Sequence, residues 1–422
     1  MDKFSRPTGT QDLLPAEQPY WEYVISSAAA TARRFGYERI ETPIFESTGL
    51  FARGVGGATD IVEKEMYSFR DKGDHPLTLR PEFTAGVVRA YIENGLHTLP
   101  KPVKLFSIGP IFRYERPQAG RFRQFHQFNA ELFGIQDPLA DLESMLLAWD
   151  LYAGWDFKGL SFQINSTGCP ACRPTYSAAL REYYQQHLHE ICDDCKRRLE
   201  TNPLRVLDCK QERCQPVIAG APQSITYLCD ECAAHFASLR GYLDALARPY
   251  TINPRLVRGL DYYTKTVFEV WAAGIGAQAA VCGGGRYDGL IELLGGQPTP
   301  AVGFAAGLER IILVMKAQGL TPPPLPVPPV FVAFSGDAAR STAIRLLVEL
   351  RAAHLGAQIA MGGSLKAQLR QADKSQARLV LIVGEDELAR GEVSLKDLTT
   401  GAQAAVPLAE VTARVVRALG AP

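Results

Sequence analysis

A run of prolines near residue 325 constrains the fold of this chain more than any other feature. Residues 321–330 of the 422-residue chain read TPPPLPVPPV, and six of the eight residues from 322 to 329 are proline. Because proline lacks a backbone N–H and fixes φ, neither a helix interior nor a central strand passes through such a segment. A run of this density forms a stiff, extended spacer. The sequence therefore predicts two parts, residues 1–320 and 330–422, joined by a linker over 321–329.

The part after the linker alternates short apolar runs with helical patterns. PVFVAF, AQIAM and LVLIVG are the apolar runs, and ARSTAIRLLVELRAAH between the first two has helical spacing of Ile, Leu and Val. Alternating strands and helices over about ninety residues are typical of an α/β domain. We expect a small domain of this class with a mainly parallel sheet.

The part before the linker has a different pattern. A helical segment over residues 17–35 is followed by longer extended segments, namely KLFSIGPIFRYE, FHQFNAELFGI, LSFQIN and TKTVFEVWA. Few long helices separate them, and they are rich in Phe, Ile and Val, which favours an antiparallel sheet flanked by helices. Residues 1–320 are therefore predicted to form an α+β domain.

Cysteines cluster inside this first domain. The chain has nine, and eight lie between Cys169 and Cys232, as three CxxC pairs together with Cys209 and Cys214. The surrounding residues 169–250 look helical, which indicates a mostly helical insertion domain. Two CxxC pairs suffice for a tetrahedral structural Zn²⁺, whereas redox-active or apolarly packed thiols are alternatives. The sequence leaves the pairing of the CxxC units, and the metal itself, open.

Charge and hydropathy exclude some functional classes. Lys plus Arg and Asp plus Glu each number 45, so a cationic surface over the whole chain is excluded, although a local basic patch is not. No apolar run approaches the ~18 residues of a membrane helix, and the first residues lack a secretory apolar stretch. We expect a cytoplasmic protein with no membrane partner.

An arginine cluster precedes a strand with a polar row. Four arginines fall within eleven residues: Arg113, Arg116, Arg121 and Arg123. Guanidinium groups bind phosphate oxygens bidentately. Strand alternation then places four side chains on one face: Phe125, Gln127, Asn129 and Glu131. The pattern indicates a site for an anionic substrate, with a solvated basic hairpin as the alternative.

Three further segments carry groups suited to binding. In LTLRPEFTAGVVRAY, Glu82 and Thr84 either bind a substrate ammonium or cap the next helix. In LVRGLDYY and CGGGRYDGL, the glycines either admit a ligand close to the backbone or form a tight hairpin turn beside core tyrosines. In AVGFAAGLERIILVM, Arg310 either meets a polyphosphate or forms a surface ion pair.

Taken together and in this order, these segments resemble the histidyl-tRNA synthetases, a family of class II aminoacyl-tRNA synthetases. Pro43 in RIETPIFE is similar to the proline of motif 1, Arg113 in FRYE to motif 2, and Arg310 in GFAAGLER to motif 3. LVRGLDYY and CGGGRYDGL resemble the two histidine-specific segments. The resemblance runs from about residue 3 to the C-terminus and includes an anticodon-binding-type domain after the linker.

The resemblance implies ATP-dependent ligation of L-histidine to histidine tRNA through a histidyl-adenylate, with release of AMP and pyrophosphate. It implies Mg²⁺ with the ATP and a homodimer formed through motif 1. Arg113 and Arg258 are the implied catalytic residues, both acting on the α-phosphate, and the implied ATP-binding residues are Arg113, Arg121 and Arg310. The implied histidine-binding residues are Glu82, Phe83, Thr84, Arg113, Gln127, Glu131, Arg258, Tyr262, Tyr263 and Tyr287. The implied contacts with the tRNA acceptor end are Arg116, Gln118 and Arg123.

One departure and one competing function accompany the resemblance. Phe83 occupies a position where the family commonly has glycine, so a ring directed into the histidine pocket would alter that pocket. The competing function is a synthetase-like regulatory subunit of ATP phosphoribosyltransferase. Such subunits typically lack the anticodon domain and the arginine of the histidine motif, whereas this chain has residues 330–422 and Arg258.

Overall fold

The computed structural model describes residues 3–57, 59–117, 120–273 and 280–420. The chain divides into two compact units, Met1–Pro323 and Pro324–Pro422. Residues 321–329 contain neither helix nor strand, as the prolines predict. The division lies inside the predicted linker. Across the described residues, no helix combines the length and the apolar character needed to cross a lipid bilayer.

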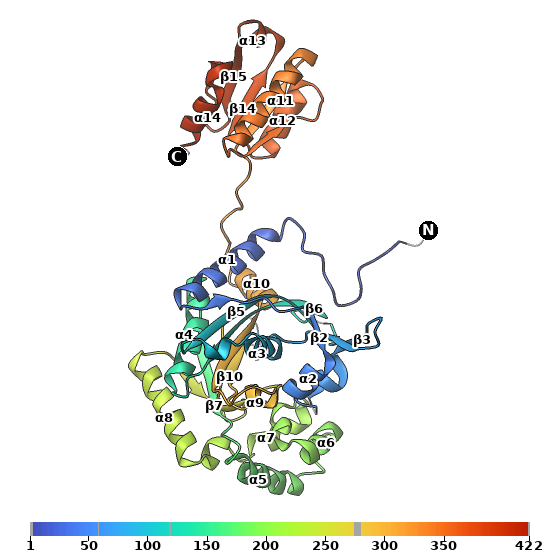
Figure 1. Ribbon diagram of the computed structural model, residues 1–422, viewed down its shortest axis with the longest axis vertical. Coiled ribbons are helices and arrows are strands. Elements are labelled where there is room, and N and C mark those ends of the chain that lie inside the picture. The colour runs from blue at the N-terminus through green and yellow to red at the C-terminus, as the bar shows by residue number, and fades with distance from the viewer. Residues whose placement is uncertain (1–2, 58, 118–119, 274–279, 421–422) are drawn as a thin grey trace. The chain divides into compact units, whose positions relative to one another are not determined.

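An eight-stranded sheet organises the first unit (Figure 1). In spatial order its strands are β1 (Glu38–Arg39), β5 (Val103–Phe112), β6 (Gln124–Phe133), β11 (Ala301–Gly307), β10 (Ala280–Arg286), β9 (Thr264–Trp271), β7 (Ser161–Ser166) and β8 (Tyr250–Ile252). The five pairings from β5 to β7 are antiparallel, and only the edge pairings β1–β5 and β7–β8 are parallel. The expected antiparallel sheet is confirmed for its six central strands.

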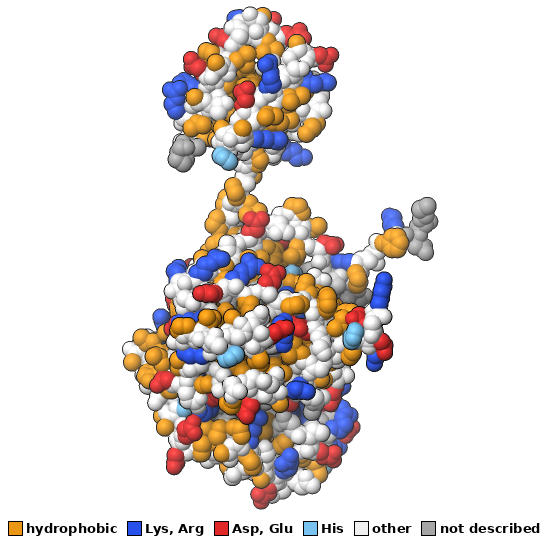
Figure 2. Space-filling view, in the orientation of Figure 1, with side chains coloured by type: hydrophobic (Ala, Val, Ile, Leu, Met, Phe, Trp, Pro, Cys, Tyr) orange, Lys and Arg blue, Asp and Glu red, His pale blue; other side chains and the backbone are white. Residues whose placement is uncertain are grey.

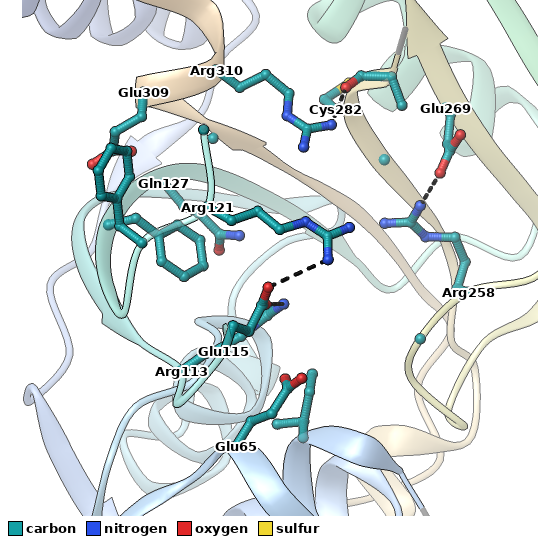
Figure 3. Close-up of a pocket in the computed structure, with 18 of the residues that line it drawn as sticks. Glu65, Arg113, Glu115, Arg121, Gln127, Arg258, Glu269, Cys282, Glu309 and Arg310 are labelled. Atoms are coloured by element: carbon teal, nitrogen blue, oxygen red, sulfur yellow. Dashed lines mark hydrogen bonds and ion pairs between the residues drawn. The ribbon is translucent and has the colours of Figure 1, made fainter. Parts of the chain in front are cut away.

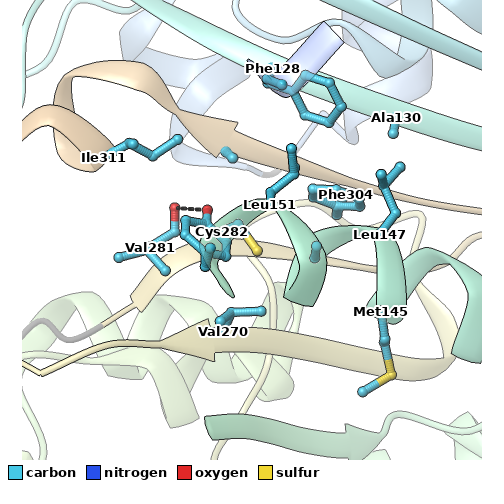
Figure 4. Close-up of a cluster of buried hydrophobic side chains, with 14 of the residues drawn as sticks. Phe128, Ala130, Met145, Leu147, Leu151, Val270, Val281, Cys282, Phe304 and Ile311 are labelled. Carbon is cyan, nitrogen blue, oxygen red and sulfur yellow. Dashed lines mark hydrogen bonds between the residues drawn. The ribbon is translucent and has the colours of Figure 1, made fainter. Parts of the chain in front are cut away.

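One face of this sheet carries the main hydrophobic core. The helices that cover it are α1 (Gln18–Arg34), α4 (Leu139–Gly154), α8 (Asp230–Ala245) and α10 (Leu308–Ala317). Phe128 of β6 and Phe304 of β11 pack there against Leu151 of α4 and Ile311 of α10 (Figure 4). Because β6 alternates, its polar row from Phe125 to Glu131 faces the opposite side.

The opposite face is covered over part of its area by smaller elements. These are α2 (Thr48–Val55), the π-helical turn η1 (Ile61–Glu65), α3 (Thr84–Glu93), the 3-10 turn η2 (Leu96–Thr98), α9 (Leu290–Leu293) and a sheet of order β2 (Phe45–Ser47), β4 (Pro76–Leu79), β3 (Tyr67–Arg70). Val87 and Tyr91 of α3 pack with Leu105 and Phe133 of the main sheet in a second core. The predicted site residues lie on this face.

The cysteine-rich insertion has a core of its own. Its elements are α5 (Arg173–Gln186), α6 (Asp193–Thr201), η3 (Pro203–Asp208), η4 (Glu212–Cys214), α7 (Gln215–Ala219) and η5 (Ser224–Tyr227), and α5, α6 and α7 gather at one end of the unit (Figure 1). Leu180, Val206 and Val217 are among the residues of that core. The predicted boundary at residue 250 is too late, because α8 contributes Phe236 and Leu239 to the main core instead.

The second unit is an α/β domain with a mixed sheet. Its strand order is β13 (Ala357–Ile359), β12 (Val330–Phe334), β14 (Leu379–Val383), β15 (Glu392–Asp397), β16 (Gln403–Pro407), and its helices are α11 (Asp337–Ala352), α12 (Leu365–Lys374), α13 (Glu385–Ala389), η6 (Leu408–Glu410) and α14 (Val411–Leu419). The pairings of β12 are parallel, whereas β15 pairs antiparallel with both neighbours. The expectation of a mainly parallel sheet is therefore only half right, because the short link between β15 and β16 permits only a hairpin. On the face shown in Figure 2, acidic and basic side chains of this unit are interspersed.

Candidate active site

A cavity of about 390 Å³ opens on the uncovered face of the main sheet. Its walls come from β6, β10, the start of α10 and residues 258–259. Four predicted arginines line it: Arg113, Arg121, Arg258 and Arg310. Figure 3 shows the guanidinium groups of Arg121, Arg258 and Arg310 directed toward the same space. Gln127, from the polar row of β6, lines it as well. The cavity thus brings together groups suited to binding a polyanion.

Backbone and carboxylate partners hold three of these arginines in position. Nε of Arg113 donates to the carbonyl of Pro81 at 2.8 Å. Glu115 lies between two of the cations, 3.8 Å from Arg113 and 3.6 Å from Arg121. Arg310 donates to the carbonyl of Ala280 at 2.8 Å, which directs the first turn of α10 toward β10.

Arg258 is held against the glycine strand. Its Nη1 donates to Glu269 on β9 at 2.6 Å, and the other carboxylate oxygen of Glu269 accepts from the Trp271 indole. A Cβ at Gly283 would lie 2.5 Å from that same Nη1, so only glycine leaves room for the guanidinium. Gly283 lies inside strand β10. The alternative of a tight hairpin turn at these glycines is therefore wrong.

A buried carboxylate lies beside the cavity. Glu131 is 1% exposed and accepts hydrogen bonds from the Thr84 hydroxyl at 2.6 Å, the Asn129 amide at 3.1 Å and the Tyr287 hydroxyl. Burial raises its pKa from 4.5 to about 7, against the lowering effect of these hydrogen bonds. A Cβ on Gly303 of the neighbouring strand would overlap this carboxylate. Glycine at position 303 therefore leaves the room that the Glu131 carboxylate occupies.

The three predicted tyrosines pack on one another next to this carboxylate. The rings of Tyr262 and Tyr263 are 4.7 Å apart, and those of Tyr262 and Tyr287 are 5.5 Å apart. All three are buried. The pKa of Tyr287 is raised well above its usual value by burial and by the charge of Glu131. The hydroxyl therefore stays protonated and donates to the carboxylate.

Comparisons with known proteins agree with this geometry. The family model for "Histidyl-tRNA synthetase" matches residues 9–311, and the "Anticodon binding domain" model matches residues 329–418. A curated relative from Dehalococcoides mccartyi, "Histidine--tRNA ligase", is 51% identical and the match covers 98% of this chain and 99% of that one. The chain belongs to the histidyl-tRNA synthetase family.

Solved structures share this fold over nearly the whole chain. The apo histidyl-tRNA synthetase of S. aureus superposes with a TM-score of 0.82 at 37% identity, covering 98% of this chain and 99% of that chain. A Bacillus halodurans protein titled as an ATP phosphoribosyltransferase regulatory subunit/histidyl-tRNA synthetase is 21% identical, with a TM-score of 0.65, covering 91% of this chain and all of that one. That second likeness extends to the fold alone.

Two predicted pocket residues of this synthetase have structural roles. Glu82 accepts the backbone N–H groups of Thr84 at 2.6 Å and Ala85 at 2.8 Å, so it caps α3 as the capping alternative predicted. Phe83 is 2% exposed, packs in the second core and has the Arg80 guanidinium 4.3 Å from its ring centre. Its place among the histidine-binding residues is a wrong expectation, because the ring faces the core and not the cavity.

The predicted tRNA contacts are dispersed. Arg116 is exposed, and Gln118 lies outside the described residues. Arg123 stacks 3.8 Å from the Tyr114 ring centre and donates to the Glu115 carbonyl at 3.2 Å. Of the two described arginines predicted to contact tRNA, Arg123 is anchored and Arg116 is exposed.

Several cavity residues escaped sequence reasoning. The acidic side chains Glu65, Glu115, Glu269 and Glu309 line the cavity, as do Arg205 and Asp208 from η3 of the insertion. Glu115 and Glu309 adjoin predicted arginines, so their positions were accessible from the motifs. Arg205 carried no such signal, because it lies about fifty residues before the histidine motif and reaches the site only through tertiary packing.

Proposed function

We propose that this synthetase ligates L-histidine to histidine tRNA through a histidyl-adenylate, with ATP as the second substrate. The observation that carries the proposal is a cavity lined by Arg113, Arg258 and Arg310, together with the buried carboxylate of Glu131 on the strand β6 that forms one of its walls. Adenylate formation needs cations around a triphosphate and a separate polar pocket for an amino acid. The arginines of the cavity supply the cations, and the polar groups around Glu131 supply the second pocket.

Different arginines bind different phosphate groups of the ATP. Arg113 and Arg258 hold the α-phosphate and stabilise the charge that develops there when the histidine carboxylate attacks. Arg310, at the start of α10, binds the terminal phosphate, and Arg121 contributes at the entrance. Their fixed partners keep the guanidinium groups in place before substrate arrives, so most of the rate arises from positioning and electrostatics. No covalent enzyme intermediate is needed.

Histidine is bound by the polar row of β6 and its neighbours. Glu131 attracts the substrate ammonium, with Thr84 as its hydrogen-bonded partner, while Glu82 fixes the backbone of Thr84. The Gln127 Oε1 atom is buried and has no hydrogen-bond partner among the described residues, which leaves it available to a ligand. Tyr262, Tyr263 and Tyr287 surround the imidazole.

ATP enters as its Mg²⁺ complex, and the cavity has carboxylates that fit the ion. Mg²⁺ in phosphate sites takes one or two protein carboxylates in addition to phosphate oxygens. Glu65 and Glu115 line the cavity on the side of Arg113. Burial and the neighbouring charge of Glu115 raise the pKa of Glu65, and a divalent cation relieves both effects. The ion supplies neutralisation of the triphosphate charge.

Transfer to tRNA involves the motif 2 loop and the second unit. Arg116, Gln118 and Arg123 contact the acceptor end, and residues 330–422 bind the anticodon stem. The match of that unit to an anticodon-binding model supports this second contact. The reaction takes place in the cytoplasm.

A homodimer formed through motif 1 completes the proposal. Apolar side chains are exposed in the segment that follows Pro43 and on the nearby strand β3. Ile44 is 44% exposed, Phe45 is 51% exposed, and Phe45 stacks edge-on with Phe69 at 6.4 Å. Exposed apolar clusters of this kind are typical of protein interfaces. Light scattering should give twice the mass of the chain, and a monomer mass would contradict the dimer.

Histidine-dependent exchange of pyrophosphate into ATP tests the catalytic proposal against the regulatory-subunit alternative. We expect exchange with the purified chain and a loss of roughly 10²–10³-fold in Arg258→Ala, because one charge-stabilising donor is removed. Arg255→Ala removes an exposed arginine three residues away and serves as the control. Absence of exchange with folded wild-type chain would favour the regulatory subunit.

A further inference from the structure

The insertion brings the eight clustered cysteines together as two groups of four. The base group is Cys169, Cys172, Cys229 and Cys232, and the inner group is Cys192, Cys195, Cys209 and Cys214. In each group all four Sγ atoms lie within 4.8 Å of one another. The fold therefore decides the pairing that the sequence left open: the first CxxC pair joins the third, and the second joins the two separate cysteines.

The sulfur separations suit a single tetrahedral ion. The Sγ atom of Cys169 lies 3.7 Å from the Sγ atom of Cys172 and 3.9 Å from that of Cys229. The Sγ atoms of Cys192 and Cys209 are 3.8 Å apart. Four thiolates at about 2.3 Å from a tetrahedral Zn²⁺ are about 3.8 Å from one another. All nine cysteines are free. A cluster of several metal atoms would hold its ligands further apart.

Backbone amides point at the sulfur atoms in both groups. The N–H of Cys229 donates to Cys172 Sγ at 3.1 Å, and the N–H of Cys192 donates to Cys214 Sγ at 3.2 Å. In the inner group the N–H of Gln211 also donates to Cys209 Sγ at 3.4 Å. Such bonds stabilise thiolate charge and orient metal ligands, and neutral packed thiols do not require them.

Most cysteines of the two groups are buried, and the other three are half-buried. Cys172 and Cys232 of the base group are buried, and so are Cys195, Cys209 and Cys214 of the inner group. Four sulfur ligands with no open position are the donor set of a structural zinc site. The soft thiolates select Zn²⁺ over the harder Mg²⁺.

We propose that the insertion binds two structural Zn²⁺ ions, one in each Cys₄ group. The base ion joins the loop after β7 to the start of α8, so it ties the two ends of the insertion together. The inner ion joins the start of α6 to Cys209, which follows η3, and to Cys214 at the end of η4. A short insertion with one small core gains folding free energy from ions held in this way.

Metal analysis of the full chain with matched variants tests the proposal. The wild-type chain, purified without chelators, should contain two zinc ions per chain. The double variants Cys229→Ser/Cys232→Ser and Cys209→Ser/Cys214→Ser should each contain one. Cys282→Ala removes the ninth cysteine, which lies in β10 outside both groups, and should retain two.

Other metal contents would overturn the proposal. A folded wild-type chain without bound metal, iron in place of zinc, or two zinc ions retained by both double variants would each contradict it. Disulfides found by mass spectrometry in chain purified under reducing conditions would do so too.

A measurement on the wild-type chain keeps the test decisive if the double variants fail to fold. Chain prepared with Co²⁺ in place of Zn²⁺ should show the sulfur-to-cobalt charge-transfer bands and the intense visible bands of tetrahedral Co²⁺. Titration of the zinc-loaded chain with a mercurial should release two zinc ions as eight thiols react. Thiols that react without metal release, together with absent cobalt bands, would overturn the proposal.

Discussion

At the scale of single residues, the environment of Glu131 sets the ionisation of the carboxylate that we propose binds histidine. Its carboxylate is buried among neutral hydrogen-bond donors. Burial raises its pKa most, and the negative charge of Glu82 raises it further. Because that pKa is about 7, the charge that attracts a substrate ammonium develops near neutral pH. We therefore expect binding of histidine to depend on pH through this side chain.

The first prediction is a pH dependence of histidine use. We expect kcat/KM for histidine to increase as pH rises through about 7, where Glu131 ionises. Glu131→Gln should lower kcat/KM and retain only the titration of the substrate's own imidazole. Pyrophosphate exchange across the neutral range measures both profiles, and identical profiles would contradict the role of Glu131.

The same group predicts a pH dependence of stability. Because folding raises the pKa of Glu131, the folded state holds its proton more tightly than the unfolded state does. Its contribution to the free energy of unfolding is present below about pH 4.5 and is lost as pH rises to about 7. Denaturant unfolding over this pH window should show that the free energy of unfolding falls less steeply with rising pH in Glu131→Gln than in wild type. Equal slopes would refute the raised pKa.

Gly283 of β10 packs against Arg258, and this contact predicts the effect of adding a side chain there. Gly283→Ala places a Cβ 2.5 Å from the Arg258 guanidinium and should reduce exchange by roughly 10²-fold, since displacing a reacting group by about 1 Å has that effect. Gly289→Ala is the control, because an added Cβ there meets no described atom within 4 Å. Equal activities of the two variants would disprove the packing of Arg258 on Gly283.

At the scale of elements, the insertion contributes to the active site through η3. Arg205 donates to the Gly259 carbonyl at 2.7 Å and lies 3.4 Å from Asp261, so it holds the loop that carries Arg258. Asn202 donates to Asp261 at 3.0 Å and strengthens the same contact. The insertion therefore acts as a support for the histidine motif.

This support predicts that Arg205→Ala lowers kcat for exchange by about 10- to 100-fold, because Arg258 loses its fixed position. Arg197→Ala, on the exposed face of α6, removes only a surface ion pair with Asp194 and should change kcat little. Steady-state kinetics of both variants measure this. A normal kcat for Arg205→Ala would show that the loop is held without η3.

Elements with a clear periodicity could be predicted from the sequence, and contacts between distant elements could not. The alternation in β6 correctly placed Gln127 and Glu131 on one face, and the linker prolines marked the division of the chain. The end of the insertion was misplaced, because the amphipathic pattern of α8 does not say which core its apolar face joins. For the same reason the structural role of Phe83 and the contact of Arg205 appeared only in the fold.

At the scale of the whole molecule, the two units have separate hydrophobic cores. The catalytic cavity is built wholly from the first unit. We therefore expect adenylate formation to require only residues 1–320, and charging of tRNA to draw on both units.

Deletion after Leu320 should separate these activities. Residues 1–320 alone should retain pyrophosphate exchange, while charging of histidine tRNA should fall by roughly 10²-fold or more, because one of two linked binding modules is lost. The ratio of the two rates, compared with that of the full chain, is the measurement. Equal loss of both activities would contradict independent units.

The most direct test of the whole account is the charging reaction itself. Purified full chain, ATP and Mg²⁺ are incubated with histidine tRNA and each of several labelled amino acids, and the labelled tRNA is measured. We expect labelled tRNA with histidine and none with the other amino acids. Folded chain that forms no histidyl-tRNA, or that charges this tRNA with another amino acid, would contradict it.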